Sequence, residues 1–193
     1  MSLHSLNGPA RMILAGQVLL VLCCVFYLWW WSMAFRPGVS VPRVTGRAGV
    51  LLAVTAAYGL GGLVLNMLGL NTIPHGAPRF GGGWLLAGGI AVYAALLLIT
   101  GVGLHRPVTS ELFLITGWAV LELSVCSTLQ AAGCFSLPCL YGLTAAIAAA
   151  FAASMVCYVL YYRLPAQAGF YSGMVPLATE AVCMAAVAAA LAL

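Results

Sequence analysis

Six apolar runs of about 20 residues each dominate the chain and leave little polar sequence between them. They cover residues 12–35, 49–70, 84–104, 111–131, 140–162 and 173–193. A helix of about 20 residues, at about 1.5 Å per residue, crosses a hydrocarbon core of about 30 Å. Only 5% of the residues are charged, whereas a soluble domain carries about a quarter. The sequence therefore predicts an all-α transmembrane bundle of six helices, forming one domain across residues 1–193 and embedded in a lipid bilayer.

The loops between the runs are rich in proline and glycine, and their arginines indicate an orientation. Five arginines fall in the first, third and fifth loops, against two on the opposite side. Cytoplasmic loops carry the excess of basic residues, so we expect the odd loops inside and both termini outside, in a bacterial inner membrane. The five are Arg36, Arg43, Arg47, Arg106 and Arg163, and the two are Arg11 and Arg79. The net charge of +4 thus reflects topology, and we expect no nucleic-acid partner.

The chain has three acidic residues, all glutamate, and two of them lie deep inside apolar runs. Glu122 is about 16 Å from the start of the fourth run, and Glu180 is about 10 Å into the sixth. No lysine exists in the chain, and no arginine lies at that depth. A carboxylate in hydrocarbon is costly, so it is buried against protein, protonated or used. We expect Glu122 to be the principal binding site for a proton or cation, with Glu180 its partner; the alternative is a neutral glutamic acid that hydrogen bonds a neighbouring helix.

Other polar and aromatic side chains at middling depth are candidates to line such a site. Trp118 falls on the same helical face as Glu122, together with Glu111, Ile115 and Cys126. Tyr58 and Tyr93 are further candidate ligand-binding residues, and Thr100, Thr116 and Ser154 are candidate lining groups. Gln17 and Asn66 both lie toward the outer side, where we expect them to pair. Such residues more often hold helices together than contact a ligand.

A polar cluster at the proposed inner boundary supports a different function, catalysis on a lipid or lipid-linked substrate. His105, Arg106 and Glu111 are weak catalytic candidates there, able to hold a phosphate headgroup and to act as general acid or base. The alternative is structural. Ser110 is a candidate N-cap, and Glu111 in the first helical turn is then stabilised by the helix dipole.

Seven cysteines are present, and two of them share the fourth loop on the proposed outer side. Cys134 and Cys139 are a candidate disulfide in an oxidising compartment. Their spacing does not match a usual zinc site, and no histidine falls in mid-membrane to bind haem. We therefore expect neither a metal nor a cofactor.

Small residues recur at four-residue spacing in three of the runs, where they allow helices to approach closely. The first reading is packing within the bundle; the second is a surface for a partner membrane protein on the Ala-rich fifth and sixth runs. The size, the six spans and these stripes are similar to those of the solute-binding subunits of energy-coupling-factor transporters. That resemblance implies a membrane-embedded solute-binding role. The stripes are Ala53, Ala57 and Gly61; Ala145, Ala149 and Ala153; and Ala181, Ala185 and Ala189.

These observations leave three hypotheses for the function. The first is a small membrane protein that binds or transports a small cationic or proton-coupled solute through Glu122 and Glu180. The second is an intramembrane enzyme acting at the cytosolic interface. The third is a non-catalytic subunit of a membrane complex.

Overall fold

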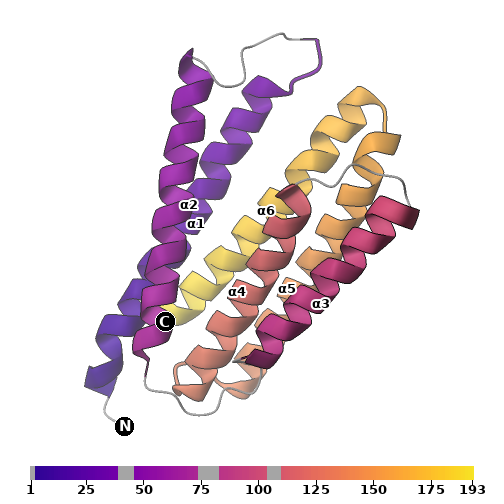
Figure 1. Ribbon diagram of the computed structural model, residues 1–193. Coiled ribbons are helices and arrows are strands. Elements are labelled where there is room, and N and C mark those ends of the chain that lie inside the picture. Colours follow the sequence, from indigo (N-terminus) through magenta and orange to yellow (C-terminus); the bar gives the residue numbers. More distant parts are fainter. Residues whose placement is uncertain (1–2, 39–45, 74–82, 104–109) are drawn as a thin grey trace.

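The computed structural model describes residues 3–38, 46–73, 83–103 and 110–193, and these residues are almost all helical. Six of the helices are long and apolar enough to cross a membrane, α3 together with the helical turn that extends it, which confirms the predicted all-α six-helix bundle (Figure 1). They are α1 (Leu3–Ala34), α2 (Gly46–Thr72), α3 (Gly83–Leu98), α4 (Ser110–Ala131), α5 (Leu137–Leu160) and α6 (Ala166–Ala192). A π-helical turn, η1 (Ile99–Gly103), extends α3, and a 3-10 turn, η2 (Tyr161–Arg163), follows α5.

The helices run alternately up and down, so both chain ends lie at the same end of the bundle (Figure 1). α1 and α2 form a close pair that lies beside the other four helices. α6 contacts both α1 and α5 and so joins the pair to the rest. α3 packs against α4 at the outer edge of the bundle.

All six helices begin earlier than the sequence predicted, and in α5 and α6 a proline marks the start. α5 begins at Leu137, where the Ser136 side chain accepts a hydrogen bond from the Cys139 backbone N–H (3.4 Å) and Pro138 occupies the first turn. α6 begins directly after Pro165, about two turns before residue 173. Measured from the observed helix starts at Ser110 and Ala166, Glu122 and Glu180 lie about 18 Å and about 21 Å along their helices.

Glycines set the close approach of α1 and α2. A Cβ atom placed on Gly62 would lie 2.9 Å from the Gly16 carbonyl oxygen, and one on Gly69 would lie 3.0 Å from the Pro9 carbonyl oxygen. Helices in lipid associate largely through such backbone proximity. Of the predicted stripe on α2, Gly61 lies close to Leu19 of α1, whereas Ala53 and Ala57 are exposed.

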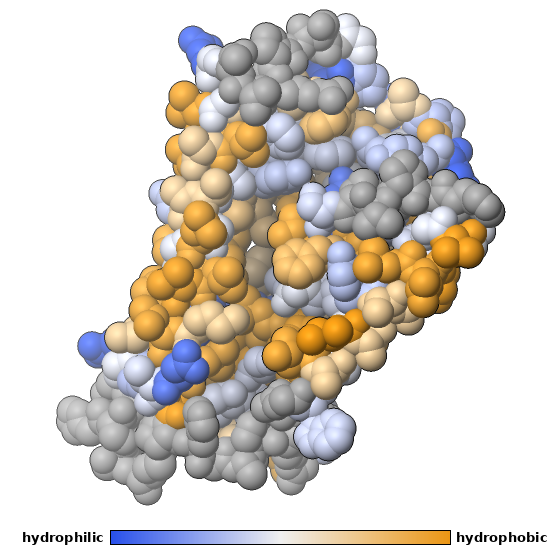
Figure 2. All heavy atoms as spheres, in the orientation of Figure 1, coloured by the Kyte–Doolittle hydropathy of each residue, from blue (hydrophilic) through white to orange (hydrophobic). Residues whose placement is uncertain are grey.

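α4 forms the centre of the bundle, with most of its length buried by other helices. Leu121, Val125 and Leu129 pack into a cluster that includes Leu140 of α5 and Val187 of α6. Apolar side chains cover the outer flanks of the bundle, as expected of surfaces that meet lipid (Figure 2). The same view shows the face hollowed between the α1–α2 pair and the other helices.

Candidate functional site

The buried polar site is assembled from α1, α2, α4 and α6. Gln17 of α1, Asn66 of α2 and Glu122 of α4 have no exposed surface at all, and Glu180 of α6 is 8% exposed. Buried polar groups are costly unless they are hydrogen bonded, so each must be accounted for by a partner or by a function.

A hydrogen-bonded chain links the first three of these residues. Gln17 Nε2 donates to Asn66 Oδ1 (3.2 Å) and to Glu122 Oε1 (3.0 Å), which uses both of its hydrogens. Asn66 Nδ2 in turn donates to the Gly62 carbonyl oxygen, one helical turn earlier (2.9 Å). The predicted pairing of Gln17 with Asn66 is therefore confirmed. The bond from Gln17 to Glu122, which joins the α1–α2 pair to α4, was not foreseen.

Gly16 leaves the space that the chain of amides occupies. A Cβ atom at Gly16 would lie 2.5 Å from Asn66 Nδ2, a distance at which the amide would have to move. Because Gly16 precedes Gln17 directly, the glycine that brings α1 and α2 together also fixes the position of the Gln17–Asn66 pair.

Several polar atoms in this region are buried without a hydrogen-bond partner. Within the described part of the chain they include Glu122 Oε2, Glu180 Oε1, Gln17 Oε1 and Trp118 Nε1. Three of the four are oxygen acceptors, and a buried acceptor without a donor costs about 1–3 kcal/mol. The site therefore has an excess of acceptors over donors, which a proton or a cation would correct.

Glu180 lies near enough to Glu122 for the two charges to interact. No arginine of the described segments contributes to the charge environment of either carboxyl group. Two like charges at close range in a medium of low dielectric constant cannot both ionise without a large cost. The sequence left open whether these two residues meet, and the fold places them within electrostatic range of each other.

Cysteines surround the two carboxyl groups. Cys24 of α1 and Cys183 of α6 each lie within electrostatic range of both Glu122 and Glu180. Cys126, one turn beyond Glu122 on α4, is completely buried. The sequence marked these residues only as small apolar side chains, and no spacing in the chain links them to the glutamates.

The predicted face of α4 does point into the protein, and Trp118 lies on it. Ile115, Trp118, Glu122 and Cys126 are all buried, and Glu111 at the start of the face is half-buried. Trp118 is 8% exposed, and its indole N–H is without a partner. It therefore has an unused donor on the same side of α4 as Glu122.

Tyr58 and Tyr93 pack against aromatic rings instead. The Tyr58 ring stacks on Phe26 with a centroid distance of 5.3 Å, and the Tyr93 ring meets Phe113 edge-on at 5.8 Å. Within the described residues, neither hydroxyl group hydrogen bonds to Glu122 or Glu180. Their assignment as ligand-binding residues stays a prediction without geometric support.

The proposed catalytic cluster at the inner boundary is described only in part. His105 and Arg106 lie outside the described residues. Glu111 lies in the first turn of α4, as expected of a residue that stabilises a helix start, and its charge reaches Tyr27 of α1.

Cys134 and Cys139 are free cysteines in the structure, so the disulfide between them stays a prediction. Cys134 belongs to the turn that ends α4, where its N–H donates to the Leu129 carbonyl oxygen (2.8 Å), while Cys139 lies in the first turn of α5. Both side chains pack against the main core cluster. Burial raises the pKa of the Cys134 thiol above its ordinary value.

Comparison of this chain with protein-family models, with curated proteins and with solved structures gives no match. The fold and the site alone therefore define the class: a helical bundle of the membrane-spanning type with two neighbouring carboxyl groups in its interior.

Proposed function

We propose that this protein binds or transports a small solute, cationic or coupled to protons, through Glu122 and Glu180. Glu122 is the principal charge site and Glu180 is its partner. The observation that carries the proposal is the state of Glu122: it is completely buried, Gln17 satisfies one of its oxygens, and its other oxygen has no partner. Intramembrane acids of this kind typically mark ion or proton pathways.

The Gln17–Glu122 hydrogen bond links the charge state of Glu122 to the contact between the α1–α2 pair and α4. A hydrogen bond to an ionised carboxylate is roughly twice as strong as a bond between neutral groups. Proton or cation binding at Glu122 therefore weakens the contact that joins α1 and α2 to α4. Cation exchange at the carboxyl groups would in this way loosen or tighten the α1–α2 pair against the other helices.

Glu111 provides a matched control for this site, because it is the third acidic residue but lies at a helix end. Na⁺, Li⁺ and tetramethylammonium are tested separately at pH 6 and pH 8. We expect at least one of them to raise the unfolding temperature of wild type. A ligand that binds only the folded state stabilises it by RT ln(1 + [L]/Kd), or about 2.7 kcal/mol at 100 times Kd. Glu122→Gln removes this response and Glu111→Gln keeps it; Glu180→Gln weakens it.

Two results would contradict the proposal. One is an identical cation and pH response in wild type and Glu122→Gln, which would make Glu122 a structural residue. The other is equal loss of the response in Glu111→Gln, which would show a general effect of surface charge. In either case the lipid-enzyme and complex-subunit hypotheses would be tested next, by lipid profiles with and without the protein and by co-purification in mild detergent.

A further inference from the structure

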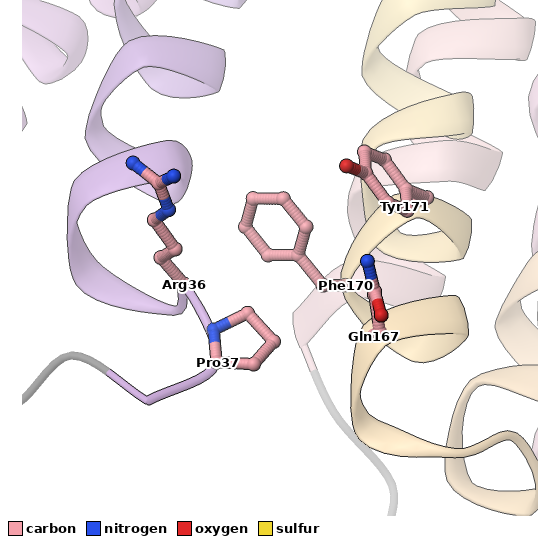
Figure 3. A pocket seen from close by; sticks show the side chains of 5 residues that line it. All are labelled: Arg36, Pro37, Gln167, Phe170 and Tyr171. Carbon is pink, nitrogen blue, oxygen red and sulfur yellow. The ribbon is translucent and has the colours of Figure 1, made fainter.

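A cavity of about 310 Å³ lies at the end of the bundle where α1 stops and α6 starts. Arg36, Pro37, Gln167, Phe170 and Tyr171 line it, and Figure 3 shows Arg36 on the α1 side, with the Phe170 ring between it and Gln167 and Tyr171 of α6 in this view. None of these residues takes part in the buried carboxyl site, which lies in the interior of the bundle. The cavity is therefore a separate feature of the molecule.

Both walls of the cavity are held in place by an aromatic cluster. The Trp31 indole N–H of α1 donates to the Phe170 carbonyl oxygen of α6 (3.2 Å), and the Trp31 ring stacks on Phe35 at 4.3 Å. Gly173 lies so close to the Trp31 ring that a side chain there would collide with it. These contacts fix the first turns of α6 against the last turn of α1, so the cavity is preformed.

The polar groups around the cavity are those that recognise an anion. Arg36 is exposed and forms no ion pair with any described residue. Gln167 adds an amide donor and Tyr171 a hydroxyl donor. No side chain caps the N-terminus of α6, so its positive end adds to the field of the arginine. Within the described residues, no acidic side chain lines the cavity to oppose this charge.

The position of the cavity fits a phosphate group at a membrane surface. It adjoins the cluster of Trp30, Trp31 and Tyr161, and aromatic side chains of this type mark the level of lipid headgroups. Arginine binds phosphate through two parallel hydrogen bonds, which a guanidinium group at the rim of an open cavity can present. The aromatic ring of Phe170 and the ring of Tyr171 supply an apolar wall beside the charge.

We propose that this cavity binds a phosphate group, with Arg36 as the anchoring cation and Gln167 and Tyr171 as hydrogen-bond donors. The group comes either from an anionic lipid or from a phosphate compound in water, and the chemistry recognised is the same. This inference does not depend on the function of Glu122 and Glu180.

The test measures thermal unfolding of the full chain in dodecylmaltoside with three additives, used separately: phosphatidylglycerol, phosphatidylcholine and inorganic phosphate. We expect phosphatidylglycerol to stabilise wild type more than phosphatidylcholine does, and Arg36→Gln to weaken its apparent affinity about fivefold. Arg163→Gln is the matched control, because it removes the same charge from the same end of the bundle outside the cavity. It keeps the wild-type response.

The outcomes separate the two sources of phosphate and also overturn the proposal if it is wrong. If inorganic phosphate stabilises the protein and Arg36→Gln weakens that effect, the cavity is a site for soluble phosphate. If only the stabilisation by phosphatidylglycerol depends on Arg36, the cavity binds a lipid headgroup. The proposal is overturned if neither phosphatidylglycerol nor inorganic phosphate stabilises wild type. It is also overturned if Arg36→Gln and Arg163→Gln lose the stabilisation equally. If Arg36→Gln does not fold, the double variant Gln167→Ala/Tyr171→Phe replaces it, and an undiminished response there also overturns the proposal.

Discussion

α4 and α3 are neighbouring helices that occupy opposite environments. In its membrane-spanning window α4 has 61% of its residues buried by protein, whereas α3 has 6%. α4 is also the least apolar of the six helices and carries Glu122, Thr116 and Ser127 in its buried set. In a membrane the surrounding lipid is as apolar as the protein core, so polar residues rather than hydrophobic ones mark the helix at the centre.

The largest expected effect comes from removing a leucine side chain on each helix. Leu129 of α4 is completely buried and Leu86 of α3 is 58% exposed. We expect Leu129→Ala to lower the free energy of unfolding by about 2–5 kcal/mol, because a cavity remains in the packed core. Leu86→Ala should change it by less than about 0.5 kcal/mol. Reversible denaturant unfolding in micelles measures both, and equal losses would show that the burial contrast has no energetic meaning.

A smaller effect is expected at the contact between α3 and α4, where two adjacent glycines of α3 offer a matched pair of substitutions. A Cβ atom at Gly89 would collide with the Val120 side chain of α4, whereas nothing lies within 4 Å of one at Gly88. Both changes to alanine improve helix propensity equally. We expect Gly89→Ala to be less stable than Gly88→Ala by about 1–3 kcal/mol, because the β-branched valine cannot easily move. Identical unfolding curves would show that α3 is held loosely against α4.

The smallest effect concerns Cys134, in the turn that ends α4. Burial raises the pKa of this thiol, so at a given pH a smaller fraction is in the reactive thiolate form. Its labelling by maleimide should therefore be slow at pH 7 and continue to increase above pH 9. Mass spectrometry of the Cys134 peptide follows the rate. Failure of both Cys134 and Cys139 to label without reductant would support the disulfide hypothesis.

The depth of a residue along its helix could be predicted, but the identity of its neighbours on other helices could not. Glu122 was placed in the interior with Trp118 and Cys126 beside it, because helical periodicity alone fixes which residues share a face. Glu180 was placed too near the start of its helix, since the start of α6 at Ala166 was missed. The bond from Gln17 to Glu122 spans 105 residues of sequence, and no local pattern encodes it.

The small-residue stripes also show that a sequence pattern does not identify the neighbours of a helix. Ala145 and Ala149 of α5 are exposed, and so are Ala185 and Ala189 of α6. The close approach of helices instead depends on Gly16, Gly62 and Gly69, which join α1 to α2. A four-residue repeat of small side chains occurs on every face of an alanine-rich helix, so the pattern cannot tell a packing face from one that meets lipid or a partner.

By itself, the sequence determined the class of fold, since only helices satisfy the backbone of a chain this apolar in lipid. It also determined which residues are costly there: two glutamates without a basic residue at their depth. Only the tertiary structure decided that these glutamates lie within electrostatic range of each other, that Gln17 bridges Asn66 and Glu122, and that Arg36 and the start of α6 line one cavity. The reason is physical: hydrophobicity fixes the depth of each helix in the membrane, whereas the rotation and neighbours of a helix depend on side-chain packing between segments far apart in the chain.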